Sequence, residues 1–249
     1  MHSFLNFWLP TILFTIVSTA IVVVSTILTK GKSRETKMLP IKIIWAVLVI
    51  FEVLKIAHMI ASNKVDGVIT PAFVPLRYPF VFCSLCMYTY PLFMFKKNKL
   101  SDSAMAFSVI PFLFTFLATL ITNAKYDLSF WHAHSYGFHF MMGAVSIYLI
   151  TSGLYKFKFK DWFGILIWFG GYIVASVILS LFIGADISIF GPSSGFLGFL
   201  YGEGTFGYAT GNLLLILVIG MLLFIIYGLI HVIGGCRPVK VKKEKQLDA

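Results

Sequence analysis

Charge is scarce in this sequence, and acidic residues are its scarcest component. Only 12% of the 249 residues are charged, with ten Asp and Glu against twenty Lys and Arg. Soluble domains average about 25% charged residues, so a soluble domain is excluded as the main body of the chain. Apolar residues make up 59% of the total, and they form long uninterrupted runs. Such runs favour membrane helices over a closed β-barrel, whose strands would alternate apolar and polar residues.

Seven apolar stretches are long enough to cross a hydrocarbon layer of about 30 Å, which takes about 20 helical residues. They lie at about 8–28, 43–61, 72–95, 104–122, 130–154, 162–183 and 211–233. The residues before the first stretch include no Lys or Arg, and no small-residue cleavage site follows it, so we expect it to remain in the mature protein. The sequence therefore predicts an all-α membrane protein. A single seven-helix transmembrane domain would occupy residues 1–235, and a basic tail would occupy 236–249.

The basic residues are distributed unevenly between the two sides that seven crossings would create. Sixteen lie in the connections after the first, third and fifth stretches or in the tail, whereas only Lys64, Arg77 and Lys125 lie on the other side. Cytoplasmic loops retain Lys and Arg, so we predict an outside N-terminus and a cytoplasmic C-terminus in the cell membrane. The net charge of +10 then reflects topology and a preference for anionic lipid surfaces, and no nucleic-acid partner is expected.

Two of the apolar stretches each carry one member of a candidate nucleophilic pair. Cys83 lies in the third stretch and His139 in the fifth, and a rise of about 1.5 Å per residue places both in the outer half of the membrane or near its midplane. A thiol buried among apolar groups is inert unless a base or a cation is nearby. We therefore predict Cys83 as a nucleophile and His139 as its base. The alternative is that Cys83 only packs as a small apolar residue.

Further polar residues inside the predicted spans could support this pair. Glu52 and Lys55 are three residues apart on one helix and can form an ion pair. That pair would either fix helix packing or line a site. Ser84 and Tyr78 are candidate donors to an oxyanion. No cofactor is predicted.

Other features have two interpretations each. Cys86 could form a redox pair with Cys83 or could simply pack. On one helix, His132 and His139 would lie about 10 Å apart along the axis and would not easily share a metal ion. We assign His132 and His134 to the loop before the fifth helix, in an interfacial solvated role, and we expect no metal site. The glycine- and aromatic-rich segment 184–210 would be either a lid or an interfacial connector.

The residues from Pro79 to Leu85 resemble the Pro-Leu-His-Leu-Cys-Ser signature on the third helix of the YwaF-like bacterial membrane proteins. That family is related to eukaryotic transmembrane protein 164. His139, preceded by Phe138, resembles the histidine of the family's fifth helix, and Glu52 fits as well. The resemblance implies a seven-helix bundle and, from the eukaryotic branch, an acyltransferase that moves a fatty acyl chain between phospholipids through a cysteine and a histidine. Val81 stands where a histidine is usual, so a second imidazole is missing.

We therefore expect a membrane-embedded lipid acyltransferase or acyl hydrolase that acts on membrane phospholipids through Cys83 and His139. The alternative is a non-enzymatic component for small-molecule binding, transport or sensing, with a pocket lined by Glu52, Lys55, His139 and Tyr201. A ceramidase-like zinc hydrolase and a thiol oxidoreductase are two further enzymatic alternatives. The first would need a third histidine in the membrane, and the second depends on Cys83 and Cys86 alone.

Overall fold

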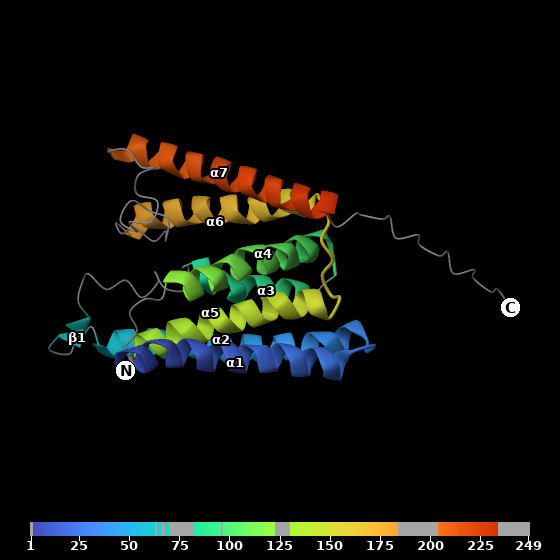
Figure 1. Ribbon diagram of the computed structural model, residues 1–249. Coiled ribbons are helices and arrows are strands. Elements are labelled where there is room, and N and C mark those ends of the chain that lie inside the picture. The colour runs from blue at the N-terminus through green and yellow to red at the C-terminus, as the bar shows by residue number, and fades with distance from the viewer. Residues whose placement is uncertain are drawn as a thin grey trace.

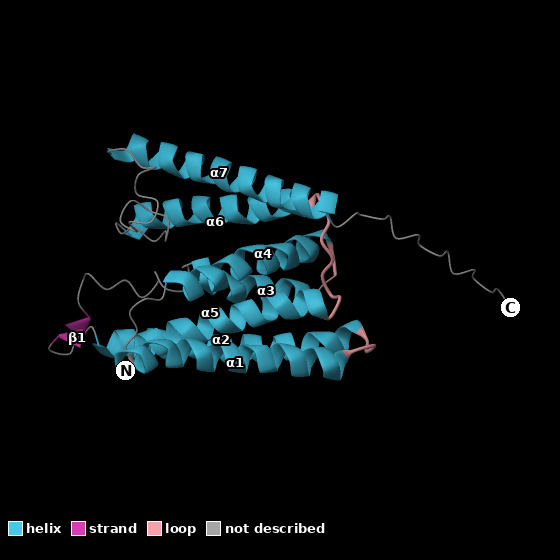
Figure 2. Ribbon diagram, in the orientation of Figure 1, coloured by secondary structure: helices cyan, strands magenta, loops and turns pink. Residues whose placement is uncertain are grey.

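The computed structural model is a bundle of antiparallel helices (Figures 1 and 2). It describes residues 2–62, 64–65, 68–69, 82–95, 97–122, 130–183 and 204–233. These residues include seven α-helices: α1 (His2–Thr29), α2 (Arg34–Ser62), α3 (Cys86–Phe95), α4 (Lys99–Thr122), α5 (Phe130–Thr151), α6 (Asp161–Ile183) and α7 (Gly204–Ile233). A 3-10 helix, η2 (Phe82–Leu85), leads into α3, and strands β1 (Lys64–Val65) and β2 (Val68–Ile69) form a short antiparallel hairpin after α2.

Among the described residues, the predicted architecture of seven helices is confirmed apart from the short hairpin, but two predicted helix starts were wrong. Helix α2 begins at Arg34 rather than near 43, because Lys and Arg side chains can extend away from the apolar layer while their backbone stays helical. Helix α7 begins at Gly204 rather than near 211, so part of the predicted loop 184–210 is helical. Residues 184–203 lie outside the described residues, as do the residues of the predicted tail.

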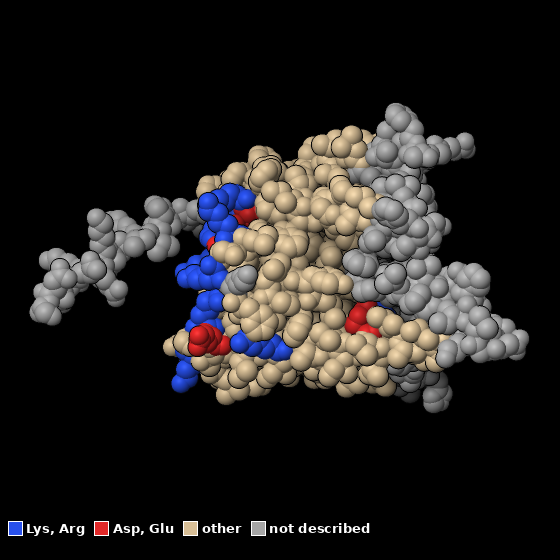
Figure 3. Space-filling model, turned by 180° about the vertical axis from the view of Figure 1, so that it is seen from behind, with Lys and Arg blue, Asp and Glu red and all other residues tan. Residues whose placement is uncertain are grey.

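The described basic residues, apart from Lys55 and Lys64, lie together at one end of the bundle. The connections after α1, α3 and α5 lie at the same end as the end of α7 (Figure 1). The space-filling view shows Lys and Arg gathered at one end of the face it displays (Figure 3). The unequal distribution of charge along the sequence therefore corresponds to an unequal distribution in space.

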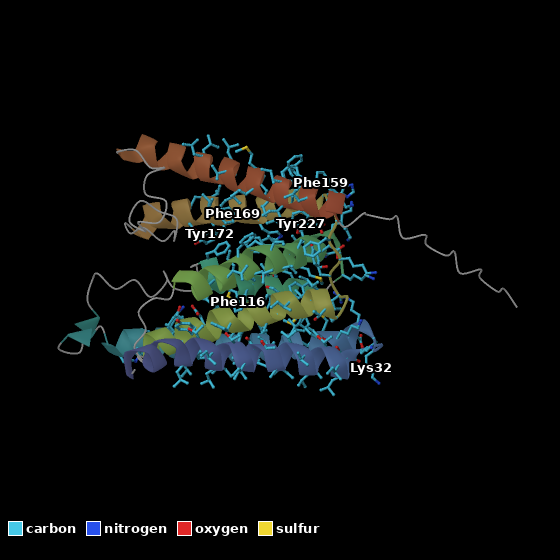
Figure 4. The ribbon with its side chains drawn as sticks, in the orientation of Figure 1. Lys32, Phe116, Phe159, Phe169, Tyr172 and Tyr227 are labelled. Atoms are coloured by element: carbon cyan, nitrogen blue, oxygen red, sulfur yellow. The ribbon has the colours of Figure 1, made fainter. Side chains whose placement is uncertain are left out.

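Helices α4 and α5 form the centre of the packing. Helix α5 packs against α1, α2 and α4, and α4 also packs against α3 and α6; α7 packs against α6. Phe82 of η2 is a central apolar anchor: its ring lies 5.5–6.2 Å, between centroids, from the rings of Phe107, Phe112, Phe169 and Tyr172. Figure 4 shows Phe169 and Tyr172 on the side of α6 that faces α4. This aromatic cluster fixes η2, and with it the residues that follow Phe82.

The outer surfaces of several helices are apolar, as expected for contact with lipid. Large exposed side chains include Ile16, Ile27 and Leu28 on α1, Ile167 and Val174 on α6, and Leu217, Met221 and Val232 on α7. Within the described residues, two helices are long and apolar enough to cross a membrane, at Thr11–Thr29 and Lys99–Leu117. That test by itself is also passed by signal sequences and by core helices of soluble proteins. The extent of the exposed aliphatic surface supports a membrane protein, since soluble monomers rarely expose such patches.

Hydrogen bonds between helices hold α3 in place within this apolar bundle. The Trp45 indole N–H donates to the carbonyl of Met87 at 3.1 Å, which joins α2 to α3. The Ser108 hydroxyl contacts the Thr89 hydroxyl at 3.0 Å, and the Ser146 hydroxyl donates to the Ser108 carbonyl at 2.8 Å. Polar contacts of this kind join helices where lipid provides no hydrophobic driving force between them. They position the short α3, and therefore η2, relative to α2, α4 and α5.

Candidate functional site

The candidate site is a polar layer inside the bundle, and its first component is the turn that carries Cys83 and Ser84. Both residues belong to η2, between the anchored Phe82 and the start of α3 at Cys86. Ser84 and Cys86 are fully buried, whereas Cys83 is half-buried. Successive residues of a 3-10 helix point about a third of a turn apart. Phe82, Cys83 and Ser84 therefore project in three different directions.

The second component is an ion pair on α2, and it contacts Ser84 directly. The Lys55 ammonium donates to Oε1 of Glu52 at 2.5 Å, and the Ser84 hydroxyl donates to the same oxygen at 3.0 Å. Glu52 and Lys55 are only 3% and 7% exposed. The predicted ion pair is therefore present and buried. One neutralised carboxylate connects α2 to the turn next to Cys83.

The other carboxylate oxygen of Glu52 distinguishes this pair from a fully satisfied structural one. Oε2 is buried and has no hydrogen-bond partner among the described residues. A buried acceptor left without a donor costs about 1–3 kcal/mol, and more when it is charged. Glu52 therefore keeps one acceptor available inside the polar layer.

The third component is the N-terminal half of α5, which carries two described imidazoles. His139 is half-buried, and His134 stacks on Phe138 with ring centroids 5.6 Å apart. The His134 ring also lies 6.1 Å from the ring of Phe51 on α2. The assignment of His132 and His134 to a loop was wrong, because α5 begins at Phe130. The sequence feature that could have indicated this earlier helix start is the absence of proline and glycine from Phe130 to Tyr136.

The three components meet electrostatically at Lys55. The charge of its ammonium group acts on Cys83, on His134 and on His139, and the charge of Glu52 also acts on Cys83. Burial and the Glu52 charge favour the thiol form of Cys83, whereas the Lys55 charge favours its thiolate form. Elements η2, α5 and α2 thus contribute a thiol, an imidazole and a cation to this layer, and a thiol with an imidazole base is a combination used in nucleophilic acyl transfer. His134 is the residue of this layer that reasoning from the sequence did not place there.

The remaining residues that the sequence analysis singled out do not add to this layer. Tyr78, Val81 and Tyr201 lie outside the described residues. Cys83 and Cys86 are both free thiols. In the part of the chain that the structure describes, no group of three or more His, Cys, Asp or Glu side chains is arranged to hold a metal ion.

Comparison with known proteins gives one match. The model of a protein family described as the TMEM164 family matches residues 2–229, which includes the polar layer and all but the last few residues of α7. No curated protein and no solved structure matches the chain. The relation to transmembrane protein 164 that the sequence motifs indicated is therefore confirmed.

Proposed function

Because the chain belongs to the TMEM164 family, we propose that it is a membrane-embedded lipid acyltransferase or acyl hydrolase. Cys83 is its nucleophile and His139 its base. The observation that carries the proposal is geometric: Ser84, next to Cys83 in η2, is hydrogen-bonded to the buried Glu52–Lys55 pair of α2, and α2 packs against α5, which carries the half-buried His139. Membrane phospholipids are the substrates, since the site lies within an apolar bundle.

The reaction proceeds through an acyl-cysteine. The His139 imidazole takes the proton of the Cys83 thiol, and the thiolate attacks the ester carbonyl carbon of a phospholipid. The tetrahedral intermediate collapses with cleavage of the ester C–O bond, and the leaving lysolipid oxygen takes the proton back from His139. A second lysolipid hydroxyl, or water, then attacks the thioester while His139 removes its proton, and that proton returns to the departing Cys83 sulfur.

The remaining polar residues have supporting roles in this scheme. The Lys55 ammonium favours the thiolate form of Cys83, and Glu52 holds Lys55 in position through their ion pair. The Ser84 hydroxyl donates its hydrogen bond to Glu52. Ser84 therefore acts as a positioning residue, and its proton is not directed at the oxyanion. Tyr78 remains a proposed donor to the oxyanion.

The test is acyl transfer by the purified chain in lipid vesicles. The vesicles contain phosphatidylcholine as acyl donor and an isotope-labelled lysophospholipid as acceptor, and labelled diacyl lipid is measured by mass spectrometry. We expect Cys83→Ala and His139→Ala to lower the initial rate by about 100-fold or more. Cys86→Ala is the matched control, because it removes a buried thiol three residues away; it should keep activity. Full activity in Cys83→Ala would overturn the proposal.

A second candidate, small-molecule binding without chemistry, is favoured by a different observation. The unpartnered Oε2 of Glu52 could accept a hydrogen bond from a ligand that carries an amino or hydroxyl group. In that case the double variant Cys83→Ser, His139→Ala would retain ligand binding, and Glu52→Gln would lose it. If the protein is an acyltransferase, the Cys83 and His139 substitutions instead abolish its acyl-transfer activity.

We also propose that the seven helices cross the cell membrane, with the N-terminus outside and the basic tail 236–249 in the cytoplasm. The support is the gathering of Lys and Arg at one end of the bundle (Figure 3), which is the arrangement that cytoplasmic loops favour. The polar layer then lies in the half of the membrane nearer the outside.

A further inference from the structure

The basic end of the bundle contains a hollow that the proposed acyl chemistry does not use. Its volume is about 300 Å³. The charged side chains that line it are Lys32, Arg34, Lys37, Lys97, Asp102, Lys156, Lys158 and Asp161. Six cationic side chains therefore face two carboxylates in one concave space.

Three separate connections build this hollow. They are the turns between α1 and α2, between α3 and α4, and between α5 and α6. Helices α2, α4 and α6 all begin there, and the N-terminal end of a helix carries a partial positive charge. Figure 4 shows Lys32 at this end of the bundle. The ends of α1, α3 and α5 lie in the same connections and carry the opposite partial charge, so the positive character of the hollow comes from its basic side chains.

Two of the cations are held in place by the backbone. The Arg34 guanidinium donates to the carbonyl of Phe93 at 2.7 Å, and the Lys37 ammonium donates to the carbonyl of Ser152 at 2.7 Å. These carbonyls lie at the C-terminal ends of α3 and α5, whose partial negative charge compensates only part of each cation's charge. Each group also keeps further N–H donors beyond the one that is used.

The two carboxylates compensate only part of the charge of the six cationic side chains. Asp161 accepts hydrogen bonds from the Tyr155 hydroxyl at 2.7 Å and from the backbone N–H of Lys158 at 3.1 Å. Burial, followed by the nearby Tyr227, raises the pKa of the Tyr155 hydroxyl above its usual range, so this donor stays protonated. Asp102 lies 3.8 Å from the Lys158 ammonium in an exposed pair, which is worth less than about 1 kcal/mol.

Three lysines remain uncompensated. Among the described residues, the ammonium groups of Lys32, Lys97 and Lys156 have no hydrogen-bond or ion-pair partner. Each comes from a different connection. A cytoplasmic topology requires basic loops but not their convergence on one hollow. Lys30, Lys99 and Lys160 show the difference, because they lie at the same end without lining it.

We infer that this hollow is a binding site for a phosphate-bearing anion, supplied either by the headgroup of an anionic lipid in the adjoining leaflet or by a soluble phosphate compound. Convergent Lys and Arg donors, together with helix N-termini, are the groups that recognise phosphate oxygens. Basic pockets at the ends of membrane helices bind lipid headgroups in the same way.

The experiment measures ligand-induced shifts in the thermal unfolding of the full chain in a neutral detergent. The probes are short-chain phosphatidylglycerol, inorganic pyrophosphate and, as the zwitterionic control, short-chain phosphatidylcholine. The triple variant Lys32→Gln, Lys97→Gln, Lys156→Gln is compared with Lys30→Gln, Lys99→Gln, Lys160→Gln. Both variants remove three exposed lysines from the same end, so they change the net charge equally.

A ligand that binds only the native state raises the unfolding temperature, and it does so more when it binds more tightly. We expect phosphatidylglycerol or pyrophosphate to stabilise the parent and the second triple variant, with an apparent affinity at least about tenfold weaker in the first. A response to phosphatidylglycerol alone identifies a lipid headgroup as the source, and a response to pyrophosphate alone identifies a soluble one. Equal weakening in both triple variants would show diffuse attraction and overturn the site, as would a parent that responds to neither probe.

Discussion

Replacing Lys55 with methionine is the perturbation whose effect the structure specifies best. Methionine keeps most of the length of the side chain but removes the charge that neutralises Glu52. The ion pair has an Nζ–Oε1 distance of 2.5 Å, and its two side chains are 8% and 4% exposed. Opposite charges 4 Å apart at an effective dielectric constant of about 20 attract by about 4 kcal/mol. Breaking a buried pair by removing one partner accordingly costs about 3–5 kcal/mol.

The double variant Glu52→Gln, Lys55→Met should recover most of that loss. It removes both charges, and the amide oxygen introduced at position 52 can still accept the hydrogen bond from Ser84. We expect a net cost within about 1 kcal/mol of the parent, because replacing a whole buried ion pair is often neutral. The free energy of unfolding is measured in mixed micelles with increasing dodecyl sulfate, and helix content is followed by circular dichroism.

The exposed pair between Lys158 and Asp102 provides the control. Its atoms lie 3.8 Å apart and its side chains are 55% and 60% exposed, so Lys158→Met should change stability by less than about 1 kcal/mol. The reasoning is refuted if Lys55→Met costs as little as Lys158→Met. It is also refuted if the double variant loses as much free energy of unfolding as Glu52→Gln and Lys55→Met lose together as single variants. The two residues would then be energetically independent.

Three further predictions concern packing and topology. Gly143→Ala should destabilise the bundle by about 1–3 kcal/mol, because the added Cβ would lie 2.5 Å from the Phe116 ring. Gly228→Ala is the control and should not destabilise it, because no atom lies within 4 Å of the added Cβ. Equal stability losses for the two variants in mixed-micelle unfolding would contradict this prediction. Tyr227→Phe removes the 2.9 Å hydrogen bond to the Tyr155 hydroxyl and should cost about 1 kcal/mol in the same assay, and an unchanged stability would count against it. Topology reporters fused to the two termini should be active on opposite sides of the membrane, and activity on the same side would exclude seven crossings.

Reasoning from the sequence found the helices because continuous apolar runs admit few other structures in lipid. It misplaced the start of α2 at Arg34 and that of α7 at Gly204, since basic residues and glycines at helix ends resemble loop composition. Membrane helices tolerate both, because long basic side chains extend away from the apolar layer and glycines let helices approach closely.

Only part of the candidate site could be predicted from the sequence, namely the part that depends on spacing along one helix. The spacing of Glu52 and Lys55 on one helix was enough to predict their ion pair. The hydrogen bond between Glu52 and Ser84 depends on how η2 docks through Phe82, and spacing along a chain contains no such tertiary information. The inclusion of His134 was missed because the beginning of a helix is among the least certain features of a sequence.

The proposed chemistry depends most on Cys83 accepting an acyl group. The direct measurement is to incubate the vesicle-embedded chain with phosphatidylcholine that carries a labelled acyl chain, without any lysolipid acceptor, and to locate the label by peptide mass spectrometry. We expect a hydroxylamine-sensitive thioester on the peptide that contains Cys83, in the parent and in Cys86→Ala, with no label in Cys83→Ala. Labelling that persists in Cys83→Ala, or that is found on Cys86 instead, would contradict a nucleophilic role for Cys83.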